Sequence, residues 1–172
     1  MSESSWTLPA WITAHYAPLG TFVETGTYEG GAVQQALDAG FQRVHSVELN
    51  RPKFNQCAKR FKGIDNVHLY FGPSVAWLPE ILAALDGPAL VWLDAHHVEG
   101  QWPLRAELGL LALAPRHGHV IAIDDMDILY GRRRPESWST ATWTHGRRAR
   151  PCSSAPTPAA WYARCNRDTA IA

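Results

Sequence analysis

TFVETGTYEGG, residues 21–31, contains the pattern that decides the fold. An apolar pair, Phe22 and Val23, meets an acidic residue, Glu24, and a loop with three glycines then leads into the apolar-rich stretch 32–37. Strand, glycine loop and helix in this order open a mononucleotide-binding unit of a doubly wound sheet. Glycines let the backbone come close to a ligand, and free N–H groups at the start of the next helix favour polar or anionic atoms. Because such turns also occur without a ligand, the pattern alone indicates a fold and not a function.

Length and composition describe a single globular domain. The chain has 172 residues, enough for one domain with a real core. Its hydrophobic fraction of 46% is ordinary, and no apolar run approaches the ~20 residues that cross a membrane. The N-terminus lacks a basic segment followed by an apolar one, so no secretory signal is expected. Three cysteines without metal-binding spacing indicate a reducing compartment. These features predict a cytoplasmic protein with no membrane partner.

The net charge is zero, but positive and negative charges are unevenly distributed. Residues 1–130 hold 8 Lys and Arg against 14 Asp and Glu, whereas residues 131–172 hold 8 Arg against 2 acids. The acidic body does not resemble a nucleic-acid-binding face, so nucleic acid is not expected as a partner. The basic segment 131–172 has one branched aliphatic residue, Ile171, and is rich in Arg, Pro, Ser and Thr. It is therefore predicted to be a poorly ordered or divergent tail that adds no core strand.

Apolar runs alternate with helical stretches between residues 21 and 130. Five strands joined by four helical crossovers predict a doubly wound, mostly parallel, Rossmann-like α/β sheet of three layers, with the C-terminal strands of such sheets missing. Residues 1–20 are interpreted as a leader with one short helix around 9–14, residues 21–130 as the sheet domain and residues 131–172 as the tail. The expected strands are 21–24, 43–49, 67–71, 89–93 and 119–123, and the expected helices are 32–39, 53–61, 75–85 and 104–113.

A polar or acidic residue follows every expected strand. In open α/β sheets, ligands bind outside the carboxyl ends of the strands. Several carboxylates at one edge repel each other unless a cation or hydrogen-bond donors offset them, so this convergence favours a binding site over a merely solvated edge. In chain order the residues are Glu24, then Glu48 and Asn50, then Gly72 and Ser74, then Asp94, His96 and His97, and finally Asp124 and Asp125.

The spacing of the first two acids points to a ribose. Glu48 follows Gly26 by 22 residues (48 − 26), the distance at which an acid after the second strand accepts hydrogen bonds from a ribose diol. Sheets that bind NAD and sheets that bind S-adenosylmethionine share this spacing. A dinucleotide loop needs glycine two positions after Gly26, where the pyrophosphate presses on the backbone, but this chain has Tyr28 there. S-adenosylmethionine has no phosphate and tolerates the side chain, so the loop favours it over NAD.

Three aspartates predict a metal site. Asp94, Asp124 and Asp125 would form a hard oxygen site for Mg²⁺, with Mn²⁺ and Ca²⁺ as less favoured ions. A bound cation would orient a substrate hydroxyl and lower its pKa. Capping of the next segment by Asp124 or Asp125 is the alternative. At the same edge, His97 or His96 is a candidate general base, although a loop histidine with only hydrogen-bonding duties explains either residue equally well.

Residues 21–127 resemble a class I S-adenosylmethionine-dependent methyltransferase. Within that class the chain is similar to the small, divalent-metal-dependent O-methyltransferases of the catechol type. The resemblance is carried by ETGTYEG, VELN, GPSVAWLPEI, VWLDAHH and IAIDD. It implies that Ser74 lies near the adenine and that Asp94, Asp124 and Asp125 are the metal ligands. The cofactor-binding residues that it implies are Glu24, Gly26, Tyr28, Gly30, Glu48, Ser74 and Asp94.

Two features depart from that family. The catechol enzymes have a lysine as base three positions after the first metal aspartate, and this chain has His97 there. Members usually end with two more strands, the last antiparallel, whereas this sequence changes character after residue 130. The resemblance implies methyl transfer to a hydroxyl of a small molecule. Two alternatives stay open: an inactive binding protein with the methyltransferase fold, and an N- or RNA methyltransferase that uses the basic tail. A homodimer is also left open.

Overall fold

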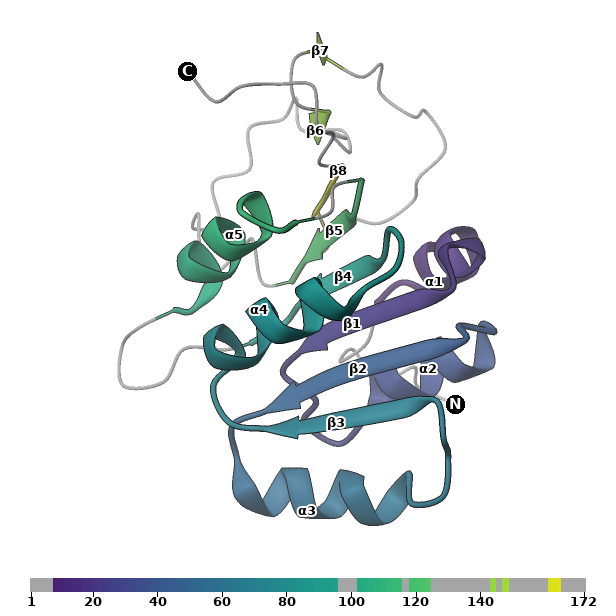
Figure 1. Cartoon of the computed structure of the whole chain (residues 1–172). Helices are drawn as coiled ribbons and strands as arrows, with labels where there is room; N and C mark the ends of the chain where they lie inside the picture. Colours follow the sequence, from purple (N-terminus) through teal and green to yellow (C-terminus); the bar gives the residue numbers. More distant parts are fainter. Residues whose placement is uncertain are drawn as a thin grey trace, which may run out of the picture.

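The computed structural model describes residues 8–95, 102–115 and 118–124, together with three short strands nearer the C-terminus. Five parallel strands form the body of the sheet in the order β3-β2-β1-β4-β5 (Figure 1). The strand order reverses between β1 and β4, and such a switch point is where doubly wound sheets bind ligands. The five strands are β1 (Thr21–Thr25), β2 (Arg43–Glu48), β3 (Val67–Phe71), β4 (Leu90–Leu93) and β5 (Val120–Ile123).

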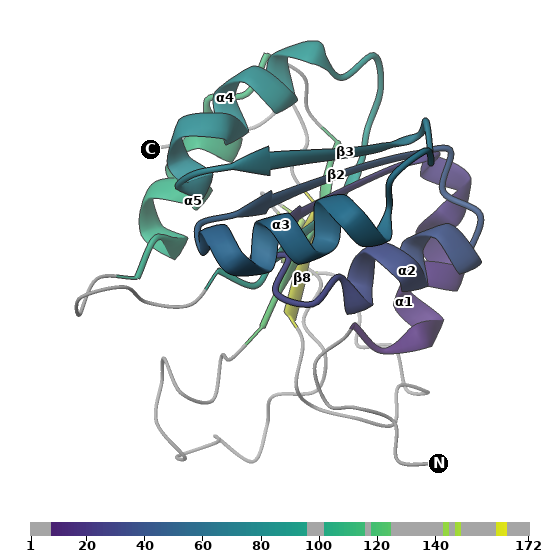
Figure 2. The ribbon, with the colours of Figure 1, turned by 90° about the horizontal axis from the view of Figure 1, so that it is seen from below.

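Helices cover both faces of the sheet, which gives the predicted three layers (Figure 2). The helices on one face pack on a core that includes Phe22, Val33 and Trp92, and those on the other pack on a core that includes Val23 and Leu78. The first face carries α1 (Ala10–Tyr16), α2 (Gly31–Asp38) and α3 (Arg51–Arg60), and the second carries α4 (Ser74–Ala84) and α5 (Leu104–Ala112); a 3₁₀ turn, η1 (Ala17–Leu19), links α1 to β1. No helix among the described residues is long and apolar enough to cross a membrane.

The expected strands and helices of residues 21–123 are confirmed to within two residues at each end. The largest difference is at α3, which begins at Arg51 and not at residue 53. Asn50 explains the earlier start, because its side-chain oxygen accepts a hydrogen bond from the backbone N–H of Lys53 at 3.1 Å and so caps the helix. Pro52 is accommodated in the first turn, where no intrahelical N–H is needed.

The leader packs onto the sheet domain. Leu8 and Ile12 are each 1% exposed and belong to the core beneath α1, α2 and α3. The side-chain amide of Gln35 in α2 donates a hydrogen bond to the carbonyl oxygen of Leu8 at 2.7 Å. The segment before β1 is therefore part of the domain, with its short helix close to the expected place.

The C-terminal segment was expected to add no core strand, and in the structure three short strands from it extend the sheet. Its strands are β6 (Trp143–Thr144), β7 (Arg147–Arg148) and β8 (Trp161–Arg164), and β8 pairs antiparallel with β5. Strand pairing satisfies the backbone groups that β5 would otherwise leave open at the sheet edge, and it does so without aliphatic side chains. The expectation relied on side-chain patterning alone, whereas β8 joins the sheet between β5 and β6 by backbone pairing.

Candidate functional site

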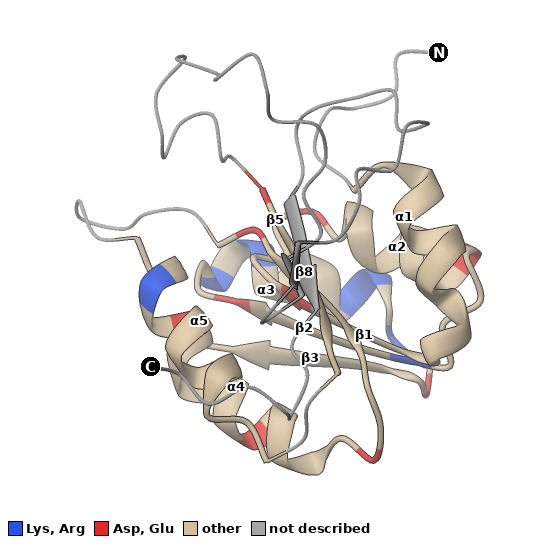
Figure 3. Ribbon diagram, turned by 90° about the horizontal axis from the view of Figure 1, so that it is seen from above, with Lys and Arg blue, Asp and Glu red and all other residues tan. Residues whose placement is uncertain are grey.

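The strand register places four predicted site residues in one row. Thr25 in β1 is opposite both Val47 in β2 and Leu93 in β4, and Leu93 is opposite Ile123 in β5. One residue further along each strand, the order across the sheet is therefore Glu48, Gly26, Asp94, Asp124. Neighbouring strands lie about 4.8 Å apart, so these residues are close together at the carboxyl edge. Acidic residues, drawn in red in Figure 3, gather around these strand ends.

The loop at 26–30 approaches the rest of the site so closely that glycine is required at two positions. Gly26 has a φ of 92°, and a Cβ there would lie 2.5 Å from the backbone oxygen of Asp94. Gly30 has a φ of 78°, and a Cβ there would lie 2.5 Å from the ring of Phe61. The sequence analysis attributed these glycines to close approach of a ligand, whereas in the structure contacts within the protein require them. The same contacts hold the backbone of the loop at the carboxyl edge.

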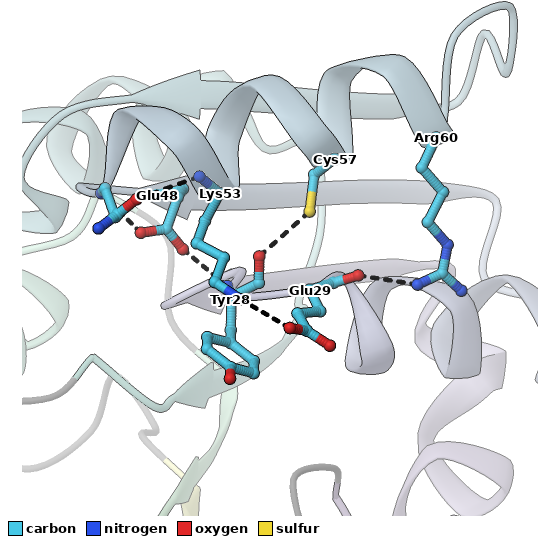
Figure 4. Close-up of polar contacts among 7 residues, drawn as sticks. Tyr28, Glu29, Glu48, Lys53, Cys57 and Arg60 are labelled. Carbon is cyan, nitrogen blue, oxygen red and sulfur yellow. Dashed lines mark hydrogen bonds and ion pairs between the residues drawn. The ribbon is translucent and has the colours of Figure 1, made fainter.

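Glu48 is held firmly and still has capacity to bind a diol. Its side chain is 8% exposed. One carboxylate oxygen, Oε2, accepts a hydrogen bond from the backbone N–H of Tyr28 at 2.6 Å (Figure 4). The other, Oε1, accepts one from the backbone N–H of Asn50 at 2.7 Å. A carboxylate oxygen has two lone pairs, so each oxygen can accept one further hydrogen bond. These bonds fix the carboxylate between the glycine loop and the start of α3, where the spacing argument placed a ribose.

Glu24 lies beneath the loop and is hydrogen-bonded to a chain of two hydroxyl groups. It is 1% exposed, and its Oε2 accepts a hydrogen bond from the Ser46 hydroxyl at 2.6 Å. The hydroxyls of Ser46 and Thr27 are hydrogen-bonded to each other, which links the end of β1 to the loop. Burial raises the pKa of Glu24 to about 8, the Ser46 hydrogen bond opposes this rise, and the charge of Glu48 adds to it. Glu24 is therefore mostly neutral at pH 7, and its repulsion of Glu48 is small.

Ser74 is brought to the same edge by the loop after β3. The N–H of Gly72 donates a hydrogen bond to the carbonyl oxygen of Glu48 at 2.9 Å, which holds this loop beside β2. Ser74 begins α4 and is 7% exposed. Glu107, 1% exposed, reaches it from α5: burial raises the pKa of Glu107, and hydrogen bonding by Ser74 opposes the rise. Sequence reasoning missed Glu107, whose only signal was one acid in an apolar helix.

The predicted metal site is partly described. Asp94 and Asp124 are neighbours in the row, as a shared cation requires. Their backbone N–H groups continue the sheet ladder, Asp94 bonding to Thr25 and Asp124 to Leu93, each at 3.0 Å. Within the described ranges, no group of three or more His, Cys, Asp and Glu side chains could hold a metal ion. Asp125, His96 and His97 lie outside the described residues, so the third ligand and the base remain predictions.

A histidine without any sequence signal is buried away from this edge. His45 in β2 is 6% exposed, and its Nδ1 is hydrogen-bonded to the Tyr70 hydroxyl at 2.9 Å. Burial, together with the charges of His68 and Arg43, lowers the pKa of His45 to about 4. His45 therefore stays neutral at physiological pH. It is a structural group with consequences for stability against pH, and no part of the candidate site.

Comparison with known proteins places the fold. No protein-family model matches the sequence, and no curated protein matches it. An O-methyltransferase from Bacillus cereus, solved in complex with SAH, superposes with a TM-score of 0.58 at 17% identity, over 72% of this chain and 60% of that one. TomG from Streptomyces achromogenes, an O-methyltransferase of tomaymycin synthesis solved with SAM, superposes with a TM-score of 0.55 at 18% identity, over 76% and 62%.

A third structure agrees with these two. The SAH-bound methyltransferase PaMTH1 from Podospora anserina superposes with a TM-score of 0.55 at 16% identity, over 69% of this chain and 50% of that one. The chain therefore spans between half and about three fifths of the length of these three proteins. Identities this low identify a shared fold, and the fold agrees with the motifs in residues 21–127. This chain has the fold of the class I S-adenosylmethionine-dependent O-methyltransferases, the family that its sequence resembles.

Proposed function

We propose that this protein binds S-adenosylmethionine at the carboxyl edge of β1, β2 and β4 and transfers its methyl group to a hydroxyl of a small molecule. The observation that carries the proposal is the arrangement of Glu48. Its carboxylate is fixed by two backbone N–H groups and keeps one acceptor position on each oxygen. That is the chemistry that a ribose diol requires, at the switch point where such sheets bind nucleosides.

Each cofactor segment has a role in this proposal. Loop 26–30 would surround the methionine part, Glu48 would accept the ribose hydroxyls, and Ser74 with its loop would border the adenine. Asp94 lies next to Gly26 in the row and would border the cofactor as well. When bound, the sulfonium supplies the reactive methyl group, so the contribution of the protein is to position the two reactants and to exclude water.

A divalent cation belongs to the same proposal. Asp94, Asp124 and Asp125 would hold Mg²⁺, and the adjacent places of Asp94 and Asp124 in the register support a pair of oxygen ligands from neighbouring strands. The cation would orient the acceptor hydroxyl, and His97 or His96 would remove its proton. We also propose a cytoplasmic location, which the buried free thiol of Cys57 supports because reducing compartments keep thiols reduced.

Transfer of a radiolabelled methyl group from S-adenosylmethionine to catechols, phenols and aliphatic alcohols tests the activity. We expect labelled product with Mg²⁺ and a loss of more than tenfold in rate with EDTA. We expect a similar loss in Asp124→Asn, because one of the charged ligands is removed. Asp86→Asn is the matched control, since Asp86 is exposed and forms an ion pair with Arg43 before β4, at the opposite edge of the sheet.

The outcomes separate the alternatives. Transfer that EDTA and Asp124→Asn leave unchanged would remove the cation from the mechanism. Cofactor binding without transfer to any hydroxyl would favour an inactive protein with the methyltransferase fold, an alternative motivated by the change in sequence character after residue 130. Methyl transfer to RNA that is lost on deletion of residues 131–172 would instead favour the N- or RNA methyltransferase.

A further inference from the structure

Tyr28 stands at the centre of the glycine loop in an unusual conformation. It is the one non-glycine residue in the described part of the chain with a positive φ, 49°. A side chain makes this left-handed region unfavourable, so other contacts must hold the residue there. The residue is 51% exposed, so burial does not explain the conformation. The contacts that hold this conformation must therefore be those made by the peptide groups and the ring face of Tyr28.

Two contacts from α3 hold Tyr28 itself. The thiol of Cys57 donates a hydrogen bond to its carbonyl oxygen at 3.3 Å (Figure 4). The ammonium group of Lys53 lies 4.0 Å from the centroid of its ring, within the range of a cation–π contact. On the other side of the residue, the N–H of Tyr28 is bound by Glu48. Both peptide groups and the ring of Tyr28 therefore have partners.

Two more contacts from α3 hold the next residue, Glu29. Its carboxylate accepts a hydrogen bond from the Lys53 ammonium at 2.6 Å, an ion pair in which the lysine side chain is 28% exposed. Its carbonyl oxygen accepts a hydrogen bond from Arg60 at 2.8 Å. The same guanidinium contacts the side-chain oxygen of Gln34 in α2 at 3.4 Å, so Arg60 joins the loop to both flanking helices.

The three α3 residues share one face of the helix. Lys53, Cys57 and Arg60 are spaced by four and three positions, which puts them one above another along α3. Figure 4 shows all three side chains pointing from the helix toward Tyr28 and Glu29. None of the three is among the residues that the family motifs select. Their only sequence signal is this spacing, and it gains meaning once the loop is known to lie against α3.

We infer that this face of α3 is a positioning surface that holds loop 26–30 in its ligand-ready conformation, with Lys53 as the residue that closes the Tyr28–Glu29 segment. The inference rests on the proposed function, because it assumes that the loop surrounds the cofactor. In this inference Lys53 acts through Tyr28 and Glu29, its partners in the structure, and not on the cofactor directly. Its effect on binding must therefore be the same for every ligand that uses the loop, whatever the charge on the sulfur atom.

Lys53→Met tests this with two readouts. We expect the dissociation constants of S-adenosylmethionine and S-adenosylhomocysteine to rise by the same factor. That factor is about fivefold, because Lys53→Met removes a partly exposed ion pair and a cation–π contact. Without ligand, hydrogen exchange of the amides at 26–30 should become several-fold faster. Lys53→Arg, which keeps the charge, should recover most of both effects. Lys59→Met is the matched control, because Lys59 is exposed on the same helix but lies outside this face.

The results distinguish the inference from the proposed function. If Lys53 instead repelled the sulfonium directly, Lys53→Met would tighten S-adenosylmethionine relative to S-adenosylhomocysteine, and the positioning role would be wrong. It would be equally wrong if amide exchange at 26–30 did not change. In a Glu29→Gln background, Lys53→Met should add little, since the two residues act as a pair. A wild type that binds neither ligand would contradict the proposed function, while the exchange measurement would still decide the role of α3.

Discussion

Gly26→Ala is expected to lower the free energy of unfolding by about 3 kcal/mol and to weaken S-adenosylmethionine binding by more than a hundredfold. A φ of 92° is unfavourable for alanine, and the new Cβ would lie 2.5 Å from the backbone oxygen of Asp94. Backbone cannot rotate away as a side chain can, so loop 26–30 must shift relative to β4. Denaturant unfolding and calorimetric titration measure the two effects.

Gly63→Ala separates the conformational cost from the collision. Gly63 has a similar φ, 84°, but a Cβ there would meet no atom within 4 Å. It lies in the turn between α3 and β3, away from the carboxyl edge. We expect a loss of about 1 kcal/mol and unchanged cofactor binding. Equal losses of stability and of affinity in the two variants would show that close approach at Gly26 has no special importance.

The second large effect concerns stability against pH, which Glu24 and His45 influence in opposite directions. The pKa of Glu24 is raised from 4.5 to about 8, so the folded chain keeps a proton that the unfolded chain has lost. Its stabilising contribution is complete below pH 4.5 and is lost as the pH rises to about 8. The pKa of His45 is lowered from 6.5 to about 4, so the unfolded chain binds a proton that the folded one excludes. Stability is therefore lost as the pH falls from 6.5 through 4.

The slopes of Glu24 and His45 oppose each other between pH 4.5 and 6.5, and between pH 6.5 and 8 only Glu24 of this pair contributes. Each group changes the free energy of unfolding by at most about 1.4 kcal/mol per pH unit within its own window. In Glu24→Gln, we expect the decline from pH 6.5 to 8 to shrink and a rise from 4.5 to 6.5 to appear. In His45→Gln, the decline should extend from pH 4.5 to 8. Urea unfolding of both variants and wild type at half-unit pH steps measures these slopes.

Cofactor binding provides an independent check on Glu24. A sulfonium and an α-ammonium group close to the loop would favour the ionised carboxylate, so binding below pH 8 should release a proton. Titration calorimetry at pH 7 in phosphate and in Tris, whose ionisation enthalpies differ, should give different apparent enthalpies for wild type. The difference should be much smaller for Glu24→Gln. Equal buffer dependence in the two proteins would show that Glu24 does not carry the proton.

The sequence was sufficient to predict the sheet, because the strands are short apolar runs separated by glycine, proline and capping residues. Errors at element ends came from caps such as Asn50, whose side chain starts α3 before Pro52. Strand β8 could not be foreseen from side-chain patterning, because it joins the sheet between β5 and β6 by backbone pairing and lacks the aliphatic pattern of a core strand.

The candidate site could be predicted where its residues follow strand ends. Glu48 and Asp94 are positioned by the register of parallel strands, which the order of the elements already implies. Lys53, Arg60 and Glu107 could not be found in this way, because their contribution depends on which helix face meets the loop or on burial between helices. Ser46 was missed for a related reason. It lies inside β2, and its hydroxyl matters only because Glu24 is opposite it on the neighbouring strand β1.

The measurement that tests the proposed cofactor site most directly is calorimetric titration of wild type and Glu48→Ala with S-adenosylmethionine, with and without Mg²⁺. We expect wild type to bind with a micromolar dissociation constant and Glu48→Ala to bind at least a hundredfold more weakly, since two hydrogen bonds to a charged acceptor are lost. The thermal midpoint of each protein must be measured alongside, because Glu48 also binds Tyr28 and Asn50. No binding by a folded wild type, or equal binding by a folded Glu48→Ala, would contradict a cofactor site built around this carboxylate.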